Sequence, residues 1–314
     1  MLRARKRACD TVRRYFDPRG FLEVETPIAV VSPGLEPHLE AFAVEEIGPD
    51  RRRQQLYLHT SPEYAMKRML GRGLGHLYQI ARVFRNGERS STHTPEFTML
   101  EWYRRPGRLE EIMEDVEGLV AAVAESVGGP WRPRRFERRS ISDAFVQAGL
   151  GDPLAHDDVA GLRRALGVRE HAEDTWEDVF HRALLERVEP TLAADGCTIL
   201  HGYPARLAAL ARLDAADPRR AERFELYVGS LELANAFGEL TDPVEQRRRF
   251  ERDLAERRRL GRAEYPIDEG LLADLGAIGE AAGVALGLDR LLMVCLGARD
   301  IADVIAFAPR DEDR

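Results

Sequence analysis

The chain has 314 residues, a length that allows one large domain or about two. Hydrophobic residues make up 44% and charged residues 32%, which is ordinary for a globular protein and excludes wholesale disorder and fibrous repeats. The net charge of -8 argues against a protein whose whole surface binds nucleic acid. No segment is apolar over the roughly 18 residues of a membrane span, and no signal peptide is visible, so we expect a cytoplasmic protein without a membrane partner.

Several common site motifs are absent from the sequence. The three cysteines, Cys9, Cys197 and Cys295, lie too far apart for a Cys-x-x-Cys metal pair or a disulfide framework, so we expect free and mostly buried thiols. The sequence also contains neither the glycine-rich Rossmann fingerprint nor a P-loop. A nucleotide site of either kind is therefore not supported.

The N-terminal segments predict two helices and two strands. Apolar residues recur at helical intervals through residues 2–16, and an Asp-Pro-Arg-Gly turn ends that helix. Residues 21–26 alternate leucine and valine with glutamate, which is the pattern of a half-exposed strand. A further strand is predicted at residues 55–59. Thr60 and Glu63 then have the spacing of a capping box, which predicts that a helix begins there.

The rest of the chain predicts more strands, with helices between them. Residues 107–222 are predicted to form a mostly helical insertion, rich in alanine, leucine, glutamate and arginine. Strands at both ends of the sequence favour an α+β fold, with an antiparallel sheet flanked by helices. The remaining strands are expected at residues 77–84, 96–103, 224–228, 231–237 and 283–287, and the remaining helices at 243–260 and from Asp289.

Side chains that share strand faces form a candidate polar site. Because side chains alternate along a strand, Phe97, Glu101 and Tyr103 are expected on one face. Residues 235–239 repeat the alternation with an amide, an aromatic ring and a carboxylate. If the two faces meet, Glu101 and Glu239 form a doubly anionic pocket whose natural complement is an ammonium group. The alternative is that both glutamates are exposed strand residues paired with arginines.

Three segments resemble the signature motifs of class II aminoacyl-tRNA synthetases. Residues 16–27 resemble motif 1, residues 83–103 resemble motif 2, and residues 283–290 resemble motif 3, in the order of the family. Among its branches lysyl-tRNA synthetase is the most similar, through Thr-Ser-Pro-Glu at 60–63 and Asn-x-Phe-x-Glu at 235–239. The resemblance implies the class II catalytic fold, the use of ATP and Mg²⁺, and a two-fold homodimer.

The start of the sequence narrows the resemblance. Lysyl-tRNA synthetases carry an N-terminal anticodon-binding domain, whereas this sequence begins directly at motif 1. We therefore expect a single catalytic domain over residues 1–314, without an anticodon-binding domain and without tRNA as a partner. A stand-alone core of this kind is similar to the elongation factor P (R)-β-lysine ligase family. That family activates β-lysine with ATP and attaches it to a lysine side chain of elongation factor P.

The resemblance also implies an ATP site. Arg85 in motif 2 is expected to hold the α-phosphate and the amino-acid carboxylate, because a guanidinium fork can satisfy oxygens of both. Phe97 and Arg290 are expected to sandwich the adenine, with His93 near the triphosphate. Arg85 and Arg290 are therefore the expected catalytic residues. The full set of expected ATP-binding residues is Arg85, Asn86, Glu88, His93, Phe97, Glu225, Gly287 and Arg290.

Acidic and polar residues are implied to bind the metal and the amino acid. Glu225 and Glu232 match the acidic pair that binds magnesium in the lysyl family, and carboxylate oxygens suit Mg²⁺. The ε-ammonium is assigned to Glu101, Tyr103 and Glu239, and the other amino group to Glu63. The full set of expected β-lysine-binding residues is Glu63, Glu101, Tyr103, Ala234, Asn235, Phe237 and Glu239.

Some positions leave alternatives open. Gly87 stands where motif 2 usually has glutamate, so whether Glu88 reads the adenine stays open. Ala234 replaces a glycine and adds a methyl group that can reshape the pocket from an α-amino to a β-amino acid. Glu63 has a capping role as its alternative, and Arg290 a salt bridge at a helix start. The alternative functions are a lysyl-tRNA synthetase paralogue that activates lysine and a non-catalytic regulator that binds an amino acid.

Overall fold

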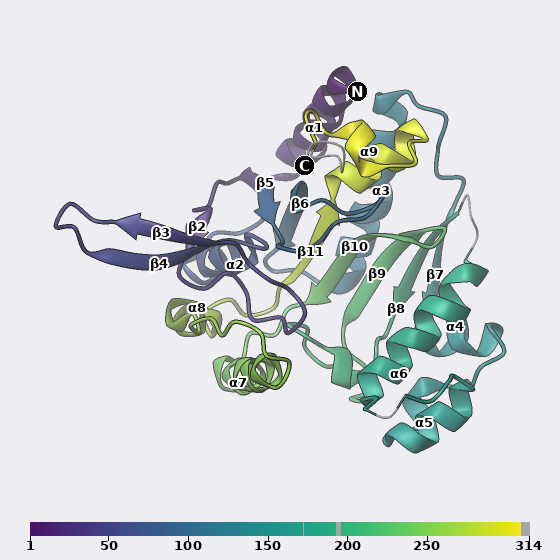
Figure 1. Ribbon diagram of the computed structural model, residues 1–314. Helices are drawn as coiled ribbons and strands as arrows, with labels where there is room; N and C mark the ends of the chain where they lie inside the picture. The colour runs from purple at the N-terminus through teal and green to yellow at the C-terminus, as the bar shows by residue number, and fades with distance from the viewer. Residues whose placement is uncertain (172, 193–195, 309–314) are drawn as a thin grey trace. The chain divides into compact units, whose positions relative to one another are not determined.

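The computed structural model describes residues 1–171, 173–192 and 196–308. The chain divides into two compact units (Figure 1). The first unit contains Met1–Arg132 and the part of the chain from Leu240 onward, and the second contains Pro133–Glu239.

The first unit is built on four strands of a sheet in the order β1-β5-β6-β11. β1 is parallel to β5, whereas β5, β6 and β11 pair antiparallel. β6 lies between two partners, and its residues from Thr98 to Tyr103 are buried, as its run of apolar side chains predicts. The strands are β1 (Leu22–Glu23), β5 (Leu77–Phe84), β6 (Glu96–Arg104) and β11 (Ala282–Gly287).

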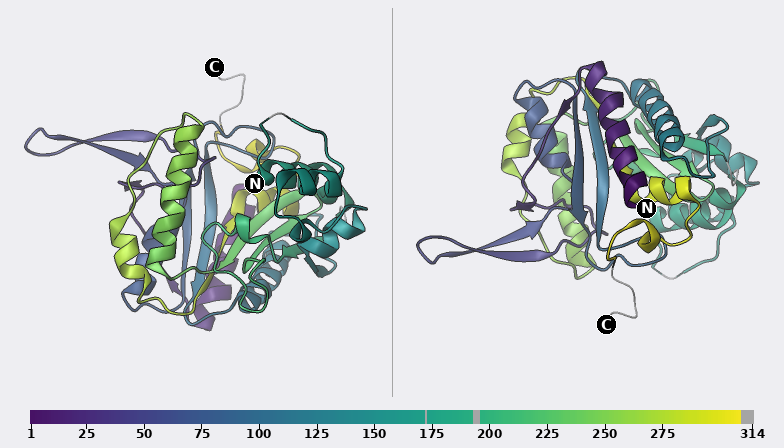
Figure 2. Two further views of the ribbon diagram at one scale, coloured as in Figure 1. Left: turned by 90° about the horizontal axis from the view of Figure 1, so that it is seen from below. Right: turned by 90° about the horizontal axis from the view of Figure 1, so that it is seen from above.

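Three helices accompany this sheet: α1 (Leu2–Phe16), α3 (Leu109–Val127) and α9 (Leu288–Leu296). α1 and α3 lie side by side (Figure 2), and α9 packs on β6 and α3. The apolar stripe of α1 is buried and ends at Phe16, whose ring centroid lies 5.0 Å from that of Tyr78 on β5. This stripe fixes motif 1 against the strands of motif 2.

A second, three-stranded sheet has the order β2-β4-β3, and the β3–β4 hairpin extends away from the rest of the first unit (Figure 1). α2 packs on α8, and α8 packs on α7. The predicted capping box is wrong, because the hydroxyl of Thr60 donates to the carbonyl oxygen of Pro33 and α2 has Pro62 as its N-cap. The elements are β2 (Ala29–Val30), β3 (Ala43–Ile47), β4 (Arg53–Leu58), α2 (Glu63–Gly71), α7 (Pro243–Arg259) and α8 (Glu269–Leu275).

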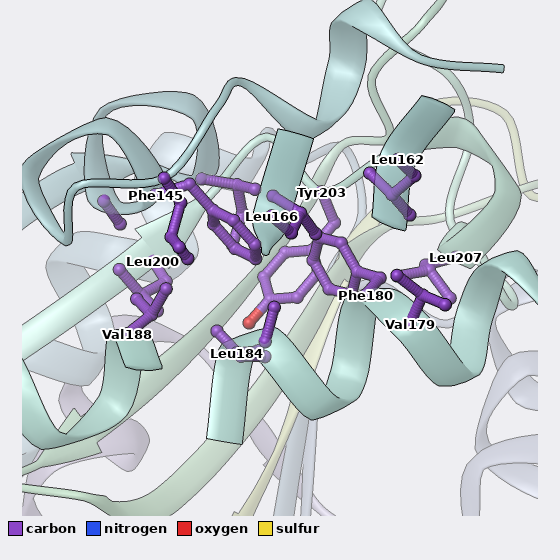
Figure 3. Packing of buried hydrophobic residues seen from close by; sticks show 14 of the residues in the cluster. Phe145, Leu162, Leu166, Val179, Phe180, Leu184, Val188, Leu200, Tyr203 and Leu207 are labelled. Atoms are coloured by element: carbon purple, nitrogen blue, oxygen red, sulfur yellow. The ribbon is translucent and has the colours of Figure 1, made fainter. Parts of the chain in front are cut away.

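The second unit has four strands in the order β7-β8-β9-β10, of which β7 and β8 are parallel and the others antiparallel. Short helices pack around a large apolar cluster (Figure 3). In it Phe145 and Trp176 stack on Phe180, with ring centroids 5.1 and 5.6 Å away. The elements are β7 (Phe136–Ser140), α4 (Ile141–Gln147), α5 (Val159–Leu166), α6 (Trp176–Ala183), a π-helical turn (Leu184–Val188), β8 (Cys197–His201), β9 (Arg223–Val228) and β10 (Leu231–Gly238).

The α+β fold class is confirmed, but several boundaries differ from the prediction. The segment predicted as a helical insertion at 107–222 contains α3, which belongs to the first unit, and the strands β7 and β8. The strand predicted at 21–26 is only two residues long, and its Leu22 is 52% exposed. Short 3₁₀ turns occupy Asp17–Arg19, Pro153–Ala155, Glu189–Thr191, Ala205–Leu207 and Ile301–Val304.

The prediction about the cysteines is confirmed. Cys197 and Cys295 are buried, Cys9 is half-buried, and none of the three is part of a disulfide bond. Among the helices of the described residues, none has the length and hydropathy to cross a membrane.

Candidate active site

The face of β6 in the first unit carries the predicted row of functional side chains. Glu101 lies opposite Gln79 on β5 and opposite Ala285 on β11, so these three side chains share a face. Phe97, two pleats away, lies on the same face and packs with Ala81, Val83, Met99 and Ala285. Glu101 thus lies on this face between the side chains of Gln79 and Ala285.

Glu101 is fully buried and accepts two hydrogen bonds. The hydroxyl of Ser61 donates to Oε1 at 2.5 Å, and the hydroxyl of Tyr103 donates to Oε2 at 2.9 Å. Burial, followed by the negative charge of Glu63, raises the pKa of Glu101 to about 8. A cation placed beside Glu101 would favour its ionised form, which makes this carboxyl group a natural partner for an ammonium group.

Glu63 and Lys67 form an ion pair on α2. The Nζ atom of Lys67 donates to Oε1 of Glu63 at 2.6 Å, and the lysine side chain is only 2% exposed. The carboxylate of Glu63 is therefore held by Lys67 and does not cap α2; the hydroxyl of Ser61 accepts the hydrogen bond of the Glu63 amide instead.

Glu36 is a site residue that the sequence did not reveal. Its Oε2 atom is buried and receives no hydrogen bond from the residues that the structure describes. Burial, followed by the negative charge of Glu63, raises the pKa of Glu36 to about 7. The loop that carries it is held by Arg257, whose Nη1 atom donates to the carbonyl oxygens of Glu36 and Leu39. No periodic pattern marks this loop, so only the fold brings Glu36 near Glu63.

Arg85 and Phe97 lie together where β5 ends and β6 begins. The guanidinium carbon of Arg85 is 5.3 Å from the centre of the Phe97 ring, within the range of a cation–π contact. Its Nε atom donates to the carbonyl oxygen of Thr60 at 3.5 Å, and Nη1 lies 4.0 Å from the carboxylate of Glu88. The backbone amide of Asn86 donates to the carbonyl oxygen of Glu40 at 2.7 Å, which anchors the start of the loop.

Motif 3 contacts the motif 2 loop through Arg290. Its Nη2 atom lies 2.6 Å from Nε2 of His93, and its Nε atom donates to the carbonyl oxygen of Thr92 at 3.2 Å. Burial and the charge of Arg290 lower the pKa of His93. Gly287 precedes α9, and the side chain of Arg290 passes 3.6 Å from the position that a Cβ atom of Gly287 would take.

Asp289 anchors this arrangement from the buried side. Its carboxylate accepts a hydrogen bond from the amide of Thr98 at 2.6 Å and pairs with Arg5 of α1. The residue is 1% exposed, so it holds the first turn of α9 against β6.

The second unit carries its own row of polar residues on β9 and β10. Glu225 lies opposite Asn235, and Glu232 lies opposite Tyr227. The carboxylate of Glu225 accepts hydrogen bonds from Arg223 at 2.5 Å, Tyr203 at 2.7 Å and Tyr227 at 2.6 Å. Burial acts to raise the pKa of Glu225, but Arg223 and these hydroxyl groups hold it below its usual value.

Asn235 and Phe237 share the face of Arg223, whereas Ala234 does not. Arg223 donates from Nε to the Oδ1 atom of Asn235 at 3.2 Å and lies opposite Phe237. Ala234 pairs with Leu226, so its methyl group lies on the opposite face of the strand from Asn235. Glu239 is 2% exposed and belongs to this unit, whereas Glu101 belongs to the first.

The comparisons with known proteins agree with this arrangement. Residues 1–311 match the model of the family described as tRNA synthetases class II (D, K and N). The chain belongs to this class II synthetase family. The predicted resemblance to class II synthetases is thereby confirmed, and Arg85 and Arg290 lie in the segments predicted to be its motifs 2 and 3.

Individual relatives of this class II synthetase chain carry a more specific name. The chain is 41% identical over 303 residues to the elongation factor P–(R)-β-lysine ligase of Proteus mirabilis. The matched residues cover 94% of this chain and 91% of the relative. The ligases of the same name from Pectobacterium atrosepticum and Edwardsiella ictaluri are 42% and 40% identical over 304 and 305 residues, covering 95% of this chain and 91% of each relative.

Proposed function

We propose that this protein activates (R)-β-lysine with ATP as an acyl-adenylate and transfers it to a lysine side chain of elongation factor P. The observation that carries the proposal is the buried carboxylate Glu101, which stands beside Ser61 and Tyr103 on the strand that also carries Phe97 near Arg85. Relatives named as ligases of this kind match nearly the whole chain, which supports the same reaction.

The first step forms the adenylate. A carboxylate oxygen of β-lysine attacks the α-phosphorus of ATP, and pyrophosphate leaves with the bonding electrons of the broken P–O bond. Arg85 stabilises the negative charge that develops on the α-phosphate oxygens, because its planar guanidinium presents two parallel donors. In the second step the ε-amine of the acceptor lysine attacks the acyl carbon, AMP leaves, and the amine loses a proton to form the amide.

The adenine is assigned to the space between Phe97 and Arg290. The ring of Phe97 and the guanidinium of Arg290 both offer flat surfaces for stacking on a base. The contact between Arg290 and His93 ties this arginine to the motif 2 loop, so that the two motifs position the nucleotide together. Glu88 can accept a hydrogen bond from the adenine only if its carboxylate moves away from Arg85, whose Nη1 atom lies 4.0 Å from it.

The amino acid is assigned to the carboxylates. Glu101 and Tyr103 would take the distal ammonium of β-lysine, and Glu63 the amino group nearer the carboxylate. An ammonium group has three donors and no acceptor, so it matches a site built from carboxylate and hydroxyl oxygens. Asn235 and Phe237 would contact the substrate carboxylate and the alkyl chain.

The second unit offers two carboxylates, those of Glu225 and Glu232, as protein ligands for Mg²⁺. Among the described residues no group of three or more histidine, cysteine or acidic side chains is arranged to hold a metal ion. Glu225 already accepts three hydrogen bonds, whereas a carboxylate offers about four acceptor positions. Mg²⁺ commonly uses one or two carboxylates together with phosphates and water, so Glu232 and the remaining position of Glu225 would hold it. There the ion would neutralise the charge of the triphosphate.

A homodimer is proposed from exposed apolar residues within motif 1 and on either side of it. Leu2 on α1 is 62% exposed and Leu22 on β1 is 52% exposed, and Ile28 and Val31 beyond β1 are 44% and 48% exposed. Such a series of exposed apolar side chains on one segment is characteristic of an interface. A two-fold dimer would bury these residues against a second copy of the chain.

ATP–pyrophosphate exchange tests the proposed function. The purified protein is assayed without tRNA on (R)-β-lysine, (S)-β-lysine and L-lysine in parallel. We expect exchange with (R)-β-lysine above the other two, and then a mass increase of purified elongation factor P by one β-lysyl group. Preference for L-lysine would favour a lysyl-tRNA synthetase paralogue, and no exchange with any of them would contradict the activation chemistry.

A further inference from the structure

Gln79 is a buried polar residue for which the proposed reaction has no role so far. It lies in the middle of β5, directly opposite Glu101 on β6, and is 5% exposed. Its carbonyl oxygen Oε1 is buried and accepts no hydrogen bond from the part of the chain that the structure describes. A buried acceptor of this kind is unfavourable unless something donates to it.

The donors near Gln79 are committed to other groups. The hydroxyls of Ser61 and Tyr103 both donate to Glu101, and Nζ of Lys67 donates to Glu63. Directly opposed residues of an antiparallel pair have their Cβ atoms about 4.5–5.5 Å apart, so the amide of Gln79 stands beside the carboxylate of Glu101. None of these hydrogen bonds goes to Oε1 of Gln79, which is therefore open to a donor from a ligand.

We propose that Gln79 is the neutral acceptor of the subsite that binds the distal ammonium of the amino-acid substrate, an inference that rests on the proposed function. The ammonium has three N–H donors, and Glu101, the hydroxyl oxygen of Tyr103 and Oε1 of Gln79 supply three acceptors on one face of the sheet. A substrate without this ammonium leaves Oε1 of Gln79 without a donor. Gln79 is therefore a specificity-determining residue.

An amide suits this position better than another carboxylate. Glu36, Glu63 and Glu101 already place negative charge in this region, and the pKa values of Glu36 and Glu101 are raised because their charged forms are poorly solvated. The carbonyl oxygen of an amide accepts a hydrogen bond at every pH and adds no charge. Gln79 thus completes the ammonium site without increasing the repulsion among the carboxylates.

The test compares two substrates that differ only in the distal ammonium. Gln79→Met keeps the length of the side chain and removes the acceptor. ATP–pyrophosphate exchange is measured with β-lysine and with 3-aminohexanoic acid, which has the same chain without the distal amine. We expect Gln79→Met to raise KM for β-lysine about tenfold or more, the usual effect of an unsatisfied polar contact, while KM for ATP and for 3-aminohexanoic acid stays within twofold.

Two further variants separate recognition from folding. Gln246→Met replaces another amide, 1% exposed and with a buried Nε2 atom that lacks a hydrogen-bond partner among the described residues, on α7 of the same unit. It is expected to keep every KM. Gln79→Glu keeps an acceptor in place and is expected to have a lower KM for β-lysine than Gln79→Met.

The outcomes distinguish this inference from the proposed function. If Gln79→Met leaves KM for β-lysine unchanged, or raises KM for both amino acids equally, the assignment of Gln79 is wrong while the proposed function stands. If the wild-type protein activates no amino acid at all, the proposed function fails and the assignment of Gln79 fails with it.

Discussion

The guanidinium of Arg290 lies 2.6 Å from Nε2 of His93, and the contact joins motif 3 to the motif 2 loop. Arginine can only donate, so Nε2 of His93 accepts and the ring proton is assigned to Nδ1, which faces the hydroxyl of Ser90 at 2.8 Å. The lowered pKa of His93 agrees with this neutral ring, because burial and the charge of Arg290 both oppose its protonation. A neutral histidine therefore orients the arginine assigned to adenine.

Replacement of His93 by alanine is expected to weaken ATP binding more than amino-acid binding. Arg290 loses one of its acceptors in the loop and keeps the carbonyl oxygen of Thr92, so its guanidinium is held less firmly. KM for ATP should therefore rise roughly tenfold, in line with the loss of one charge-assisted hydrogen bond. KM for β-lysine should stay within about threefold, since the ring has no place in the ammonium site. Exchange kinetics with each substrate varied in turn measure both values. His38→Ala, at an exposed position, is the control, and an unchanged KM for ATP in His93→Ala would contradict the coupling.

Arg85→Lys is expected to slow adenylate formation while the fold stays intact. Lysine keeps the positive charge but loses the two parallel donors that a guanidinium offers to the α-phosphate and the carboxylate. The rate of exchange at saturating substrates should fall roughly a hundredfold, the usual effect of losing one transition-state contact. Arg82→Lys, on an exposed residue of the same segment, should leave the rate unchanged. An equal effect of both substitutions would count against a special role of Arg85.

The sequence predicts the face of a strand better than it predicts loops and caps. Phe97, Glu101 and Tyr103 lie on one face because strand geometry forces side chains to alternate, and this holds in any strand of regular register. On β10 the register shifts between Glu232 and Ala234, and a shift of this kind cannot be read from residue types. The alternation of side chains therefore predicts the face of each residue only as far as the next β-bulge.

Contacts between distant parts of the chain explain the predictions that are wrong. Thr60 has the spacing of a cap, but its hydroxyl donates to Pro33, a residue of another loop that only the fold brings close. Glu36 lies in a loop without periodicity and is positioned by Arg257 of α7. β7 was missed because its residues 136–140 are mostly charged or polar, and its strand geometry comes from parallel pairing with β8.

Because the pKa of Glu101 is raised, the difference in stability between Glu101→Gln and the wild-type protein is expected to depend on pH. Its pKa is about 8 in the folded protein and near 4.5 when unfolded, so the folded state keeps a proton that the unfolded chain releases. The free energy of unfolding therefore falls as pH rises between these values. Glu101→Gln removes this dependence, so its stability relative to wild type should increase by on the order of a few kcal/mol between pH 5 and pH 8.5. Urea unfolding at both pH values measures the change, and Glu96→Gln on the exposed end of β6 should give none.

The aromatic stack of the second unit predicts which residue most stabilises it. Phe180 is fully buried and contacts the rings of Phe145 and Trp176, with centroids 5.1 and 5.6 Å away. Phe180→Ala leaves a cavity among these rings and is expected to reduce the free energy of unfolding by about 3–5 kcal/mol. Val146→Ala, at a side chain that is 57% exposed on α4, should change it by less than about 0.5 kcal/mol. Urea unfolding followed by far-ultraviolet circular dichroism measures both, and a similar loss in the two variants would mean that the stack does not determine the stability of this unit.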